Sequence, residues 1–110
     1  RVISVATDFA EAWGFWGATY ALSEMEEASR VFARECLTEA VALLPDTVEA
    51  EAVMPEGSAA TELRRQSAAG LDMLCVGSRG YGPLRRVLLG SVTSELVREA
   101  GCPVVVMPRA

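Results

Sequence analysis

The stretch "LDMLCVGSRGYGPLRRVLLGSVTSELV", residues 71–97, indicates the fold of this chain. It opens with a nearly continuous apolar run, which is typical of a strand buried on both faces of a parallel sheet. Four glycines and three arginines follow, and no acidic residue lies between Gly77 and Ser91. The next residues, 91–101, have helical spacing, with Gly101 at the end and an inner face of Val92, Leu96, Val97 and Ala100. The stretch therefore predicts a strand, a glycine-rich turn and a helix in succession.

Strands and helices alternate on both sides of this stretch. Strands are predicted at Val2–Val5, 48–54 and 102–108, and helices at 23–46 and 57–70. Residues 8–22 hold both tryptophans without a clean period and are interpreted as a loop with aromatic anchors. Alternating strands and helices predict an α/β fold with an open parallel sheet and helices on both faces.

Local signals mark the ends of the two earlier helices. Ser23 and Glu26 have the spacing of a capping box at the start of the long helix. Ser58 is the expected N-cap of the next helix, and Gly70 its C-terminal glycine. The long helix is expected to bury one stripe, made of Met25, Ser29, Phe32, Cys36, Ala40 and Leu43.

Composition excludes several classes of function. The chain has 110 residues, enough for one domain, and a net charge of -5, which argues against nucleic acid or an anionic membrane as a partner. No apolar run approaches the roughly 20 residues of a membrane span. The chain has no histidine, so histidine-dependent catalysis and the common metal sites are excluded, and we expect no metal site. The three cysteines, Cys36, Cys75 and Cys102, are predicted to be reduced and buried in the core.

The glycine-rich turn is a candidate anion site. Ligands of open parallel sheets bind beyond the carboxyl ends of the strands, where Gly77 is expected. Glycine allows a ligand to approach the backbone, and the free amides of the helix that follows suit a phosphate. The alternative is an ordinary tight connection in which Ser91 only caps the helix.

The same residues resemble a known family. "GSRGYGPLRRVLLGS" resembles the nucleotide-binding signature of the universal stress proteins, which is Gly, two residues, Gly, nine residues, Gly, then Ser or Thr. Gly77, Gly80, Gly90 and Ser91 match its fixed positions. The flanking segments "EAVMPEGSAATEL" and "EAGCPVVVMPR" resemble that family too, so the likeness covers roughly residues 23–109.

The resemblance implies a Rossmann-like fold and a cofactor, ATP, either alone or with Mg²⁺. By position, Gly77, Gly80 and Ser91 would hold phosphates and Gly90 the ribose–phosphate region, while Val92 and Thr93 would complete the wall. Arg79, Arg85 and Arg86 are not fixed members of the signature, although their summed field favours an anion.

The strand count departs from the family pattern. The family has five parallel strands in the order 3-2-1-4-5, and this sequence predicts four. In the favoured interpretation Val2–Val5 is the second family strand and the first strand–helix unit is absent from residues 1–110. In the other, the opening strand is the first, and Asp8 contacts the nucleotide. We therefore expect one domain that is N-terminally incomplete or one half of a tandem protein.

Two functions from different classes remain open. The first is a cytoplasmic, ATP-binding stress-response sensor or switch that is not an enzyme and hydrolyses ATP slowly at most. The second is a scaffold domain that binds no nucleotide and serves dimerisation. The apolar strand at 102–108 is expected to lie at a sheet edge and to pair with a second domain or chain through Val104, Val105, Val106 and Met107.

Overall fold

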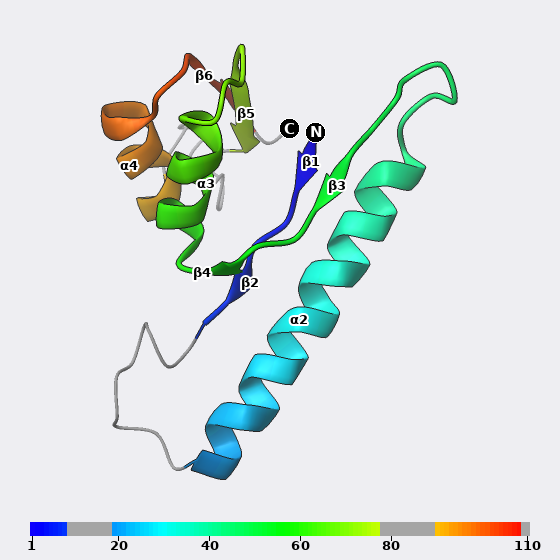
Figure 1. Cartoon of the computed structure of the whole chain (residues 1–110), viewed down its shortest axis with the longest axis vertical. Coiled ribbons are helices and arrows are strands. Elements are labelled where there is room, and N and C mark those ends of the chain that lie inside the picture. Colours follow the sequence, from blue (N-terminus) through cyan, green and yellow to red (C-terminus); the bar gives the residue numbers. More distant parts are fainter. Residues whose placement is uncertain (9–18, 78–89, 109–110) are drawn as a thin grey trace, which may run out of the picture. The chain divides into compact units, whose positions relative to one another are not determined.

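The computed structural model describes residues 1–8, 19–77 and 90–108, so the predicted loop at 9–18 and the turn at 78–89 lie outside the described residues. The chain divides into two compact units, Arg1–Glu62 and Leu63–Ala110, called unit 1 and unit 2 below. Every strand pair that the structure describes is parallel. Helices and parallel strands alternate along the chain, which confirms the predicted α/β class (Figure 1).

Unit 1 is built on one long parallel ladder. Strand β1 (Val2–Ile3) pairs with β3 (Ala52–Val53), and β2 (Ala6–Thr7) pairs with β4 (Glu56–Gly57). Backbone hydrogen bonds continue the ladder, from the Val2 amide to the Asp8 amide. In this register the nitrogen of residue 55 would donate to the Ser4 carbonyl, but Pro55 has no N–H, and this explains why each strand is split into two short pieces.

The observed ladder differs from the predicted strand boundaries. The opening strand reaches Thr7 rather than ending at Val5, and the third strand lies at 52–57 rather than 48–54. The last residue of β4, Gly57, has φ 147°, a backbone conformation that favours glycine. The shift places Glu56 and Gly57 at the carboxyl end of this strand pair.

Helix α2 (Thr19–Ala42) contacts β1, β2 and β3 and lies along them in Figure 1. The predicted capping box is wrong, because the helix begins at Thr19 and Ser23 is an exposed residue inside it. Residues 19–22 are therefore helical, not part of the predicted loop. A hydrogen bond of 2.8 Å from the Thr7 amide to Ser29 Oγ attaches the helix to β2.

The predicted stripe of α2 is buried only in part: Met25, Ser29, Cys36 and Ala40 are half-buried, whereas Phe32 and Leu43 are exposed, and Leu43 lies beyond the helix end at Ala42. Ala33 is 3 % exposed, whereas Phe32 is 69 % and Leu43 85 % exposed. Two of the most buried side chains of unit 1, Ala6 and Ala33, are therefore small. Small residues allow the helix to approach the strands closely, but they bury little apolar area.

Unit 2 contains the other strand pair. Strand β5 (Leu74–Gly77) pairs in parallel with β6 (Val104–Met107), with Leu74 opposite Val104 and Gly77 opposite Met107. Helix α4 (Ser91–Glu99) contacts β6, and its Leu96 is fully buried. Thr93 is buried in this helix, whereas Val97, predicted to point inward, is 52 % exposed.

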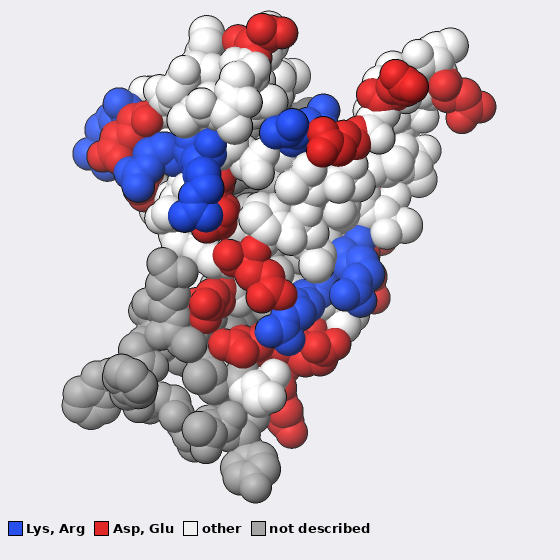
Figure 2. All heavy atoms as spheres, viewed as in Figure 1, with Lys and Arg blue, Asp and Glu red and all other residues white. Residues whose placement is uncertain are grey.

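Helix α3 (Ala59–Ser67) spans the boundary between the units. Ser58 occupies the predicted N-cap position, where its carbonyl accepts a hydrogen bond from the Glu62 amide. Gly70 follows the helix with φ 90°, as expected of a glycine after a helix end. Figure 2 shows acidic and basic side chains side by side over α3 and α4, where Arg64 pairs with Glu95 and Glu99.

The prediction that β5 is buried on both faces is wrong for this structure. Leu74 is buried, but Cys75 is exposed and Met73 is 56 % exposed. Cys36 and Cys102 are half-buried, so none of the three cysteines is a fully buried core residue. Within the described part of the chain β5 has one ladder partner, β6. A strand at the edge of a sheet is less buried than a strand with neighbours on both sides.

Candidate functional site

The carboxyl end of β5 and the first turn of α4 are joined by a hydrogen bond. The Thr93 hydroxyl donates to the carbonyl of Gly77 over 3.0 Å. Thr93 is 6 % exposed, whereas Gly77 is exposed, so the bond is partly buried. Two predicted site residues that are 16 positions apart in the sequence therefore lie in direct contact.

The start of α4 carries no side-chain cap. Gly90 is the N-cap residue, with φ -66° and ψ 167°, and its carbonyl accepts a hydrogen bond of 2.9 Å from the Ser94 amide. Ser91 is the exposed first residue of the helix and not its cap. Glycine has no side-chain oxygen to accept from the first amides of a helix, so Gly90 itself does not cap these donors. The first turn also contains no acidic residue.

Neither the packing of the described residues nor the backbone conformation at position 77 requires a glycine there. A Cβ atom added there would meet no described atom within 4 Å, and Gly77 is not among the glycines with positive φ. Gly101, in the same unit, is different, because its Cβ would lie 3.0 Å from the Cα of Ala68. The packing of unit 2 therefore explains Gly101 but leaves Gly77 unexplained.

The structure describes five of the six predicted site residues. Gly77 ends β5, Gly90 and Ser91 begin α4, and half-buried Val92 precedes Thr93 in its first turn. Gly80 lies outside the described residues, as do Arg79, Arg85 and Arg86. Sequence reasoning missed the hydrogen bond from Thr93 to Gly77, although a threonine on the inner side of a helix start is a signal for such a contact.

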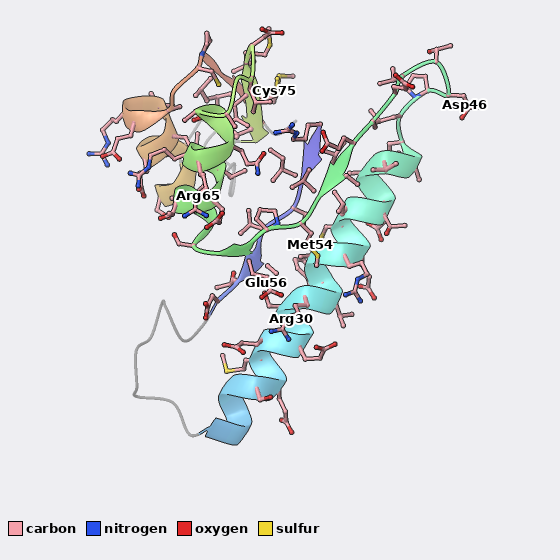
Figure 3. The ribbon with its side chains drawn as sticks, viewed as in Figure 1. Arg30, Asp46, Met54, Glu56, Arg65 and Cys75 are labelled. Atoms are coloured by element: carbon pink, nitrogen blue, oxygen red, sulfur yellow. The ribbon has the colours of Figure 1, made fainter. Side chains whose placement is uncertain are left out.

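A second polar cluster lies in unit 1, at the carboxyl ends of β2 and β4. The guanidinium of Arg30 donates to Glu56 Oε1 over 2.6 Å and to Glu27 Oε2 over 3.2 Å, and Figure 3 shows Arg30 of α2 beside Glu56. These contacts, with Glu56 the stronger, raise the pKa of Arg30 above its usual value. The cluster borders a hollow of about 90 Å³, lined by Ala6, Thr7, Asp8, Glu26, Arg30 and Glu56.

Asp8 lies at the end of the first ladder, where its amide donates to the Gly57 carbonyl over 3.2 Å. Sequence reasoning singled out Asp8 but did not connect it with Arg30 or Glu56, because these residues come from three separate elements. No group of three or more acidic, cysteine or histidine side chains in residues 1–8, 19–77 and 90–108 has a geometry that suits a metal ion. Within the same ranges no helix is both long and apolar enough to cross a bilayer.

Comparison with known proteins gives one consistent result. The Universal stress protein family matches residues 1–108. Universal stress protein Rv2005c of Mycobacterium tuberculosis is 61 % identical over 36 residues, which are 33 % of this chain and 12 % of that protein. A universal stress protein of Mycolicibacterium smegmatis is 41 % identical over 83 residues, 76 % of this chain and 26 % of that protein.

Universal stress protein YxiE of Bacillus subtilis is 34 % identical over 61 residues, 54 % of this chain and 41 % of that protein. The matched part of the chain thus spans between 12 % and 41 % of the length of these relatives. The family match covers almost every residue, including the β5–α4 junction and the ladder of unit 1. The chain therefore belongs to the universal stress protein family.

Proposed function

We propose that this chain is an ATP-binding module that holds the nucleotide phosphates at the junction of β5 and α4. The proposed site contains Gly77, Gly80, Gly90, Ser91, Val92 and Thr93. The observation that carries the proposal is the open space at Gly77. A glycine at a strand end that the described residues do not require would be accounted for by a ligand that approaches the backbone closely.

The charge pattern at the start of α4 supports the same proposal. The N-terminus of a helix carries roughly half a positive charge, and acidic side chains in the first turn usually offset it. In this chain of net charge -5, the first turn of α4 has no acid and its N-cap has no side chain. An anion at this position would find amide donors that the N-cap residue does not cap, and a favourable dipole.

Substitution of Gly90 separates helix stability from nucleotide binding. The backbone angles of Gly90 suit any residue, so Gly90→Asp can cap the helix and should raise the stability of unit 2 by a few tenths of a kcal/mol. The new carboxylate would repel phosphate, and we expect ATP affinity to fall at least tenfold, about 1.4 kcal/mol. Gly90→Val should also weaken binding at least tenfold, by blocking the backbone.

Calorimetry with ATP on the full-length protein measures these effects, and Gly90→Asn is the matched neutral variant. Asparagine also caps the helix, so it should weaken binding less than aspartate does. Ser58→Asp places the same charge at the start of α3 and should leave ATP affinity unchanged. A folded Gly90→Asp variant that binds ATP as tightly as the wild type would refute the phosphate site.

We propose further that the module is a cytoplasmic sensor or switch and not an enzyme. The sequence offers no histidine as a general base, so slow hydrolysis is the most that we expect. Binding of ATP would then act through occupancy of the site rather than through turnover. A single-turnover assay that showed fast, protein-dependent hydrolysis would contradict this part of the proposal.

The strand pairing supports the interpretation of the opening strand as the family's second strand. In the order 3-2-1-4-5 the third strand neighbours the second, and here β1 and β2 pair with β3 and β4. Likewise β5 and β6 correspond to the neighbours 4 and 5. We propose that a first strand–helix unit from outside residues 1–110 completes the domain, either from the same polypeptide or from a second domain.

The scaffold function remains a second candidate because β6 exposes apolar side chains. Val105 is 38 % and Met107 58 % exposed, and this strand has one ladder partner among the described residues. Two-fold pairing through Val104–Met107, between chains or tandem domains, would cover them. Such pairing is compatible with ATP binding, so ATP affinity is the measurement that separates the two candidates.

A further inference from the structure

The Thr93 hydroxyl is directed at β5 and not at the open end of α4. It donates to the Gly77 carbonyl over 3.0 Å and is buried with its side chain at 6 % exposure. A hydroxyl has one hydrogen to donate. While that hydrogen is used on Gly77, Thr93 has no proton to offer to an anion.

We infer that Thr93 is a positioning residue, which acts on the nucleotide through Gly77 and not by direct contact. Its hydrogen bond fixes the end of β5 against the first turn of α4. The backbone of Gly77 and the amides at the helix start are thereby held for one and the same phosphate group. The inference deepens the proposed function and rests on it.

The geometry indicates why this bond should matter more for binding than for folding. Gly77 is the last residue of β5, and the structure describes no further element directly after it. The side chain of Gly77 cannot restrain the backbone by packing, because it has none and its Cβ position is open. Within the described residues, the bond to Thr93 and the ladder with β6 are what fix this strand end.

The test is a series of substitutions at Thr93 in the full-length protein, with ATP affinity measured by calorimetry. Thr93→Val keeps the size of the side chain but leaves the Gly77 carbonyl without its donor, and we expect binding to weaken about five- to tenfold. Thr93→Ser restores the donor and should bind within about twofold of the wild type. If the valine variant does not fold, Thr93→Cys replaces it; a thiol is a weak donor, so its affinity should lie below that of the serine variant.

Ser67→Ala is the control for a general loss of stability in unit 2. Ser67 is 1 % exposed; its hydroxyl donates to the Arg64 carbonyl over 2.6 Å and accepts from the Gly101 amide over 2.9 Å. The alanine variant therefore loses two buried hydrogen bonds away from Gly77, and its melting temperature should fall while ATP affinity is kept. Adenosine is the second control, since a positioning role for phosphate predicts that Thr93→Val affects adenosine less than ATP.

The outcomes separate the inference from the proposed function. A wild-type protein that binds no ATP would overturn both. A wild type that binds ATP, with a valine variant that binds equally well, would overturn the role of Thr93 alone. Thr93 would also be only a structural residue if Thr93→Val and Ser67→Ala lowered ATP affinity equally. The same would follow if Thr93→Val lowered the affinities for ATP and adenosine equally. A loss that is specific to ATP and is rescued by serine supports the inference.

Discussion

Replacing Gly77 by alanine should move stability and ATP affinity in opposite directions. The new methyl group would meet no described atom within 4 Å, and the backbone of Gly77 is not in the left-handed region. Alanine at such a position restricts the unfolded chain, which should stabilise the protein by about 0.4–1 kcal/mol. The substitution should therefore increase the stability of the fold.

The same methyl group should weaken the binding of ATP. If phosphate oxygens contact the backbone at the end of β5, a Cβ atom there prevents one or two charge-assisted hydrogen bonds, each worth about 1.5–3 kcal/mol. ATP affinity should then fall by at least about tenfold, since 1.4 kcal/mol corresponds to one decade. Thermal unfolding and calorimetry on the same full-length variant measure the two effects.

Gly101→Ala is the matched control, because it is the same substitution in the same unit. Its methyl group would lie 3.0 Å from the Cα and 3.3 Å from the Cβ of Ala68, so overpacking should cost about 1–3 kcal/mol of stability. Its ATP affinity should match that of the wild type as long as the protein is folded. A Gly77→Ala variant that binds ATP normally would refute the argument that a ligand explains this glycine.

Two further predictions concern the surfaces that the structure leaves exposed. Val105→Lys places a charge in the middle of β6 and should disrupt the proposed two-fold pairing, so light scattering should give the mass of the unpaired species. An unchanged mass in a folded variant would reject the pairing through Val104–Met107. In the isolated 110-residue chain, thiol alkylation should be faster at exposed Cys75 than at half-buried Cys36 and Cys102. In the full-length protein a strand–helix unit beside β5 should slow alkylation of Cys75 strongly, and equal rates in both proteins would count against it.

The parts of the fold that could be predicted are those with local signals. Ser58 and Gly70 were correctly placed at the two ends of α3, because capping and positive φ are properties of a few neighbouring residues. The parallel class followed from the alternation of strands and helices, and the last strand, predicted at 102–108, is present at Val104–Met107.

The errors arose where burial depends on partners distant in the sequence. Periodicity indicates which residues share a face, but not which face has something packed on it. Phe32, Leu43 and Val97 are apolar and suitably spaced, yet they are exposed. Cys75 lies in an apolar run that predicts burial on both faces, but burial of that kind needs neighbours on both edges of β5. The capping box failed for a related reason, since a serine on an exposed face is tolerated inside a helix at little cost.

The two short helices in the described part of the chain provide the strongest argument for the proposed ligand at the β5–α4 junction. Both α3 and α4 have nine residues. The first follows Ser58 and has Glu62 in its first turn, which is what stability alone would favour. The second follows Gly90 and has no acid there, although acidic residues outnumber basic ones by 15 to 10 in the chain. A helix start without a side-chain cap forgoes a few tenths of a kcal/mol of stability. The Thr93 hydroxyl joins this helix start to Gly77, a glycine that the packing of the described residues does not require. The proposed phosphate would account for both departures at once.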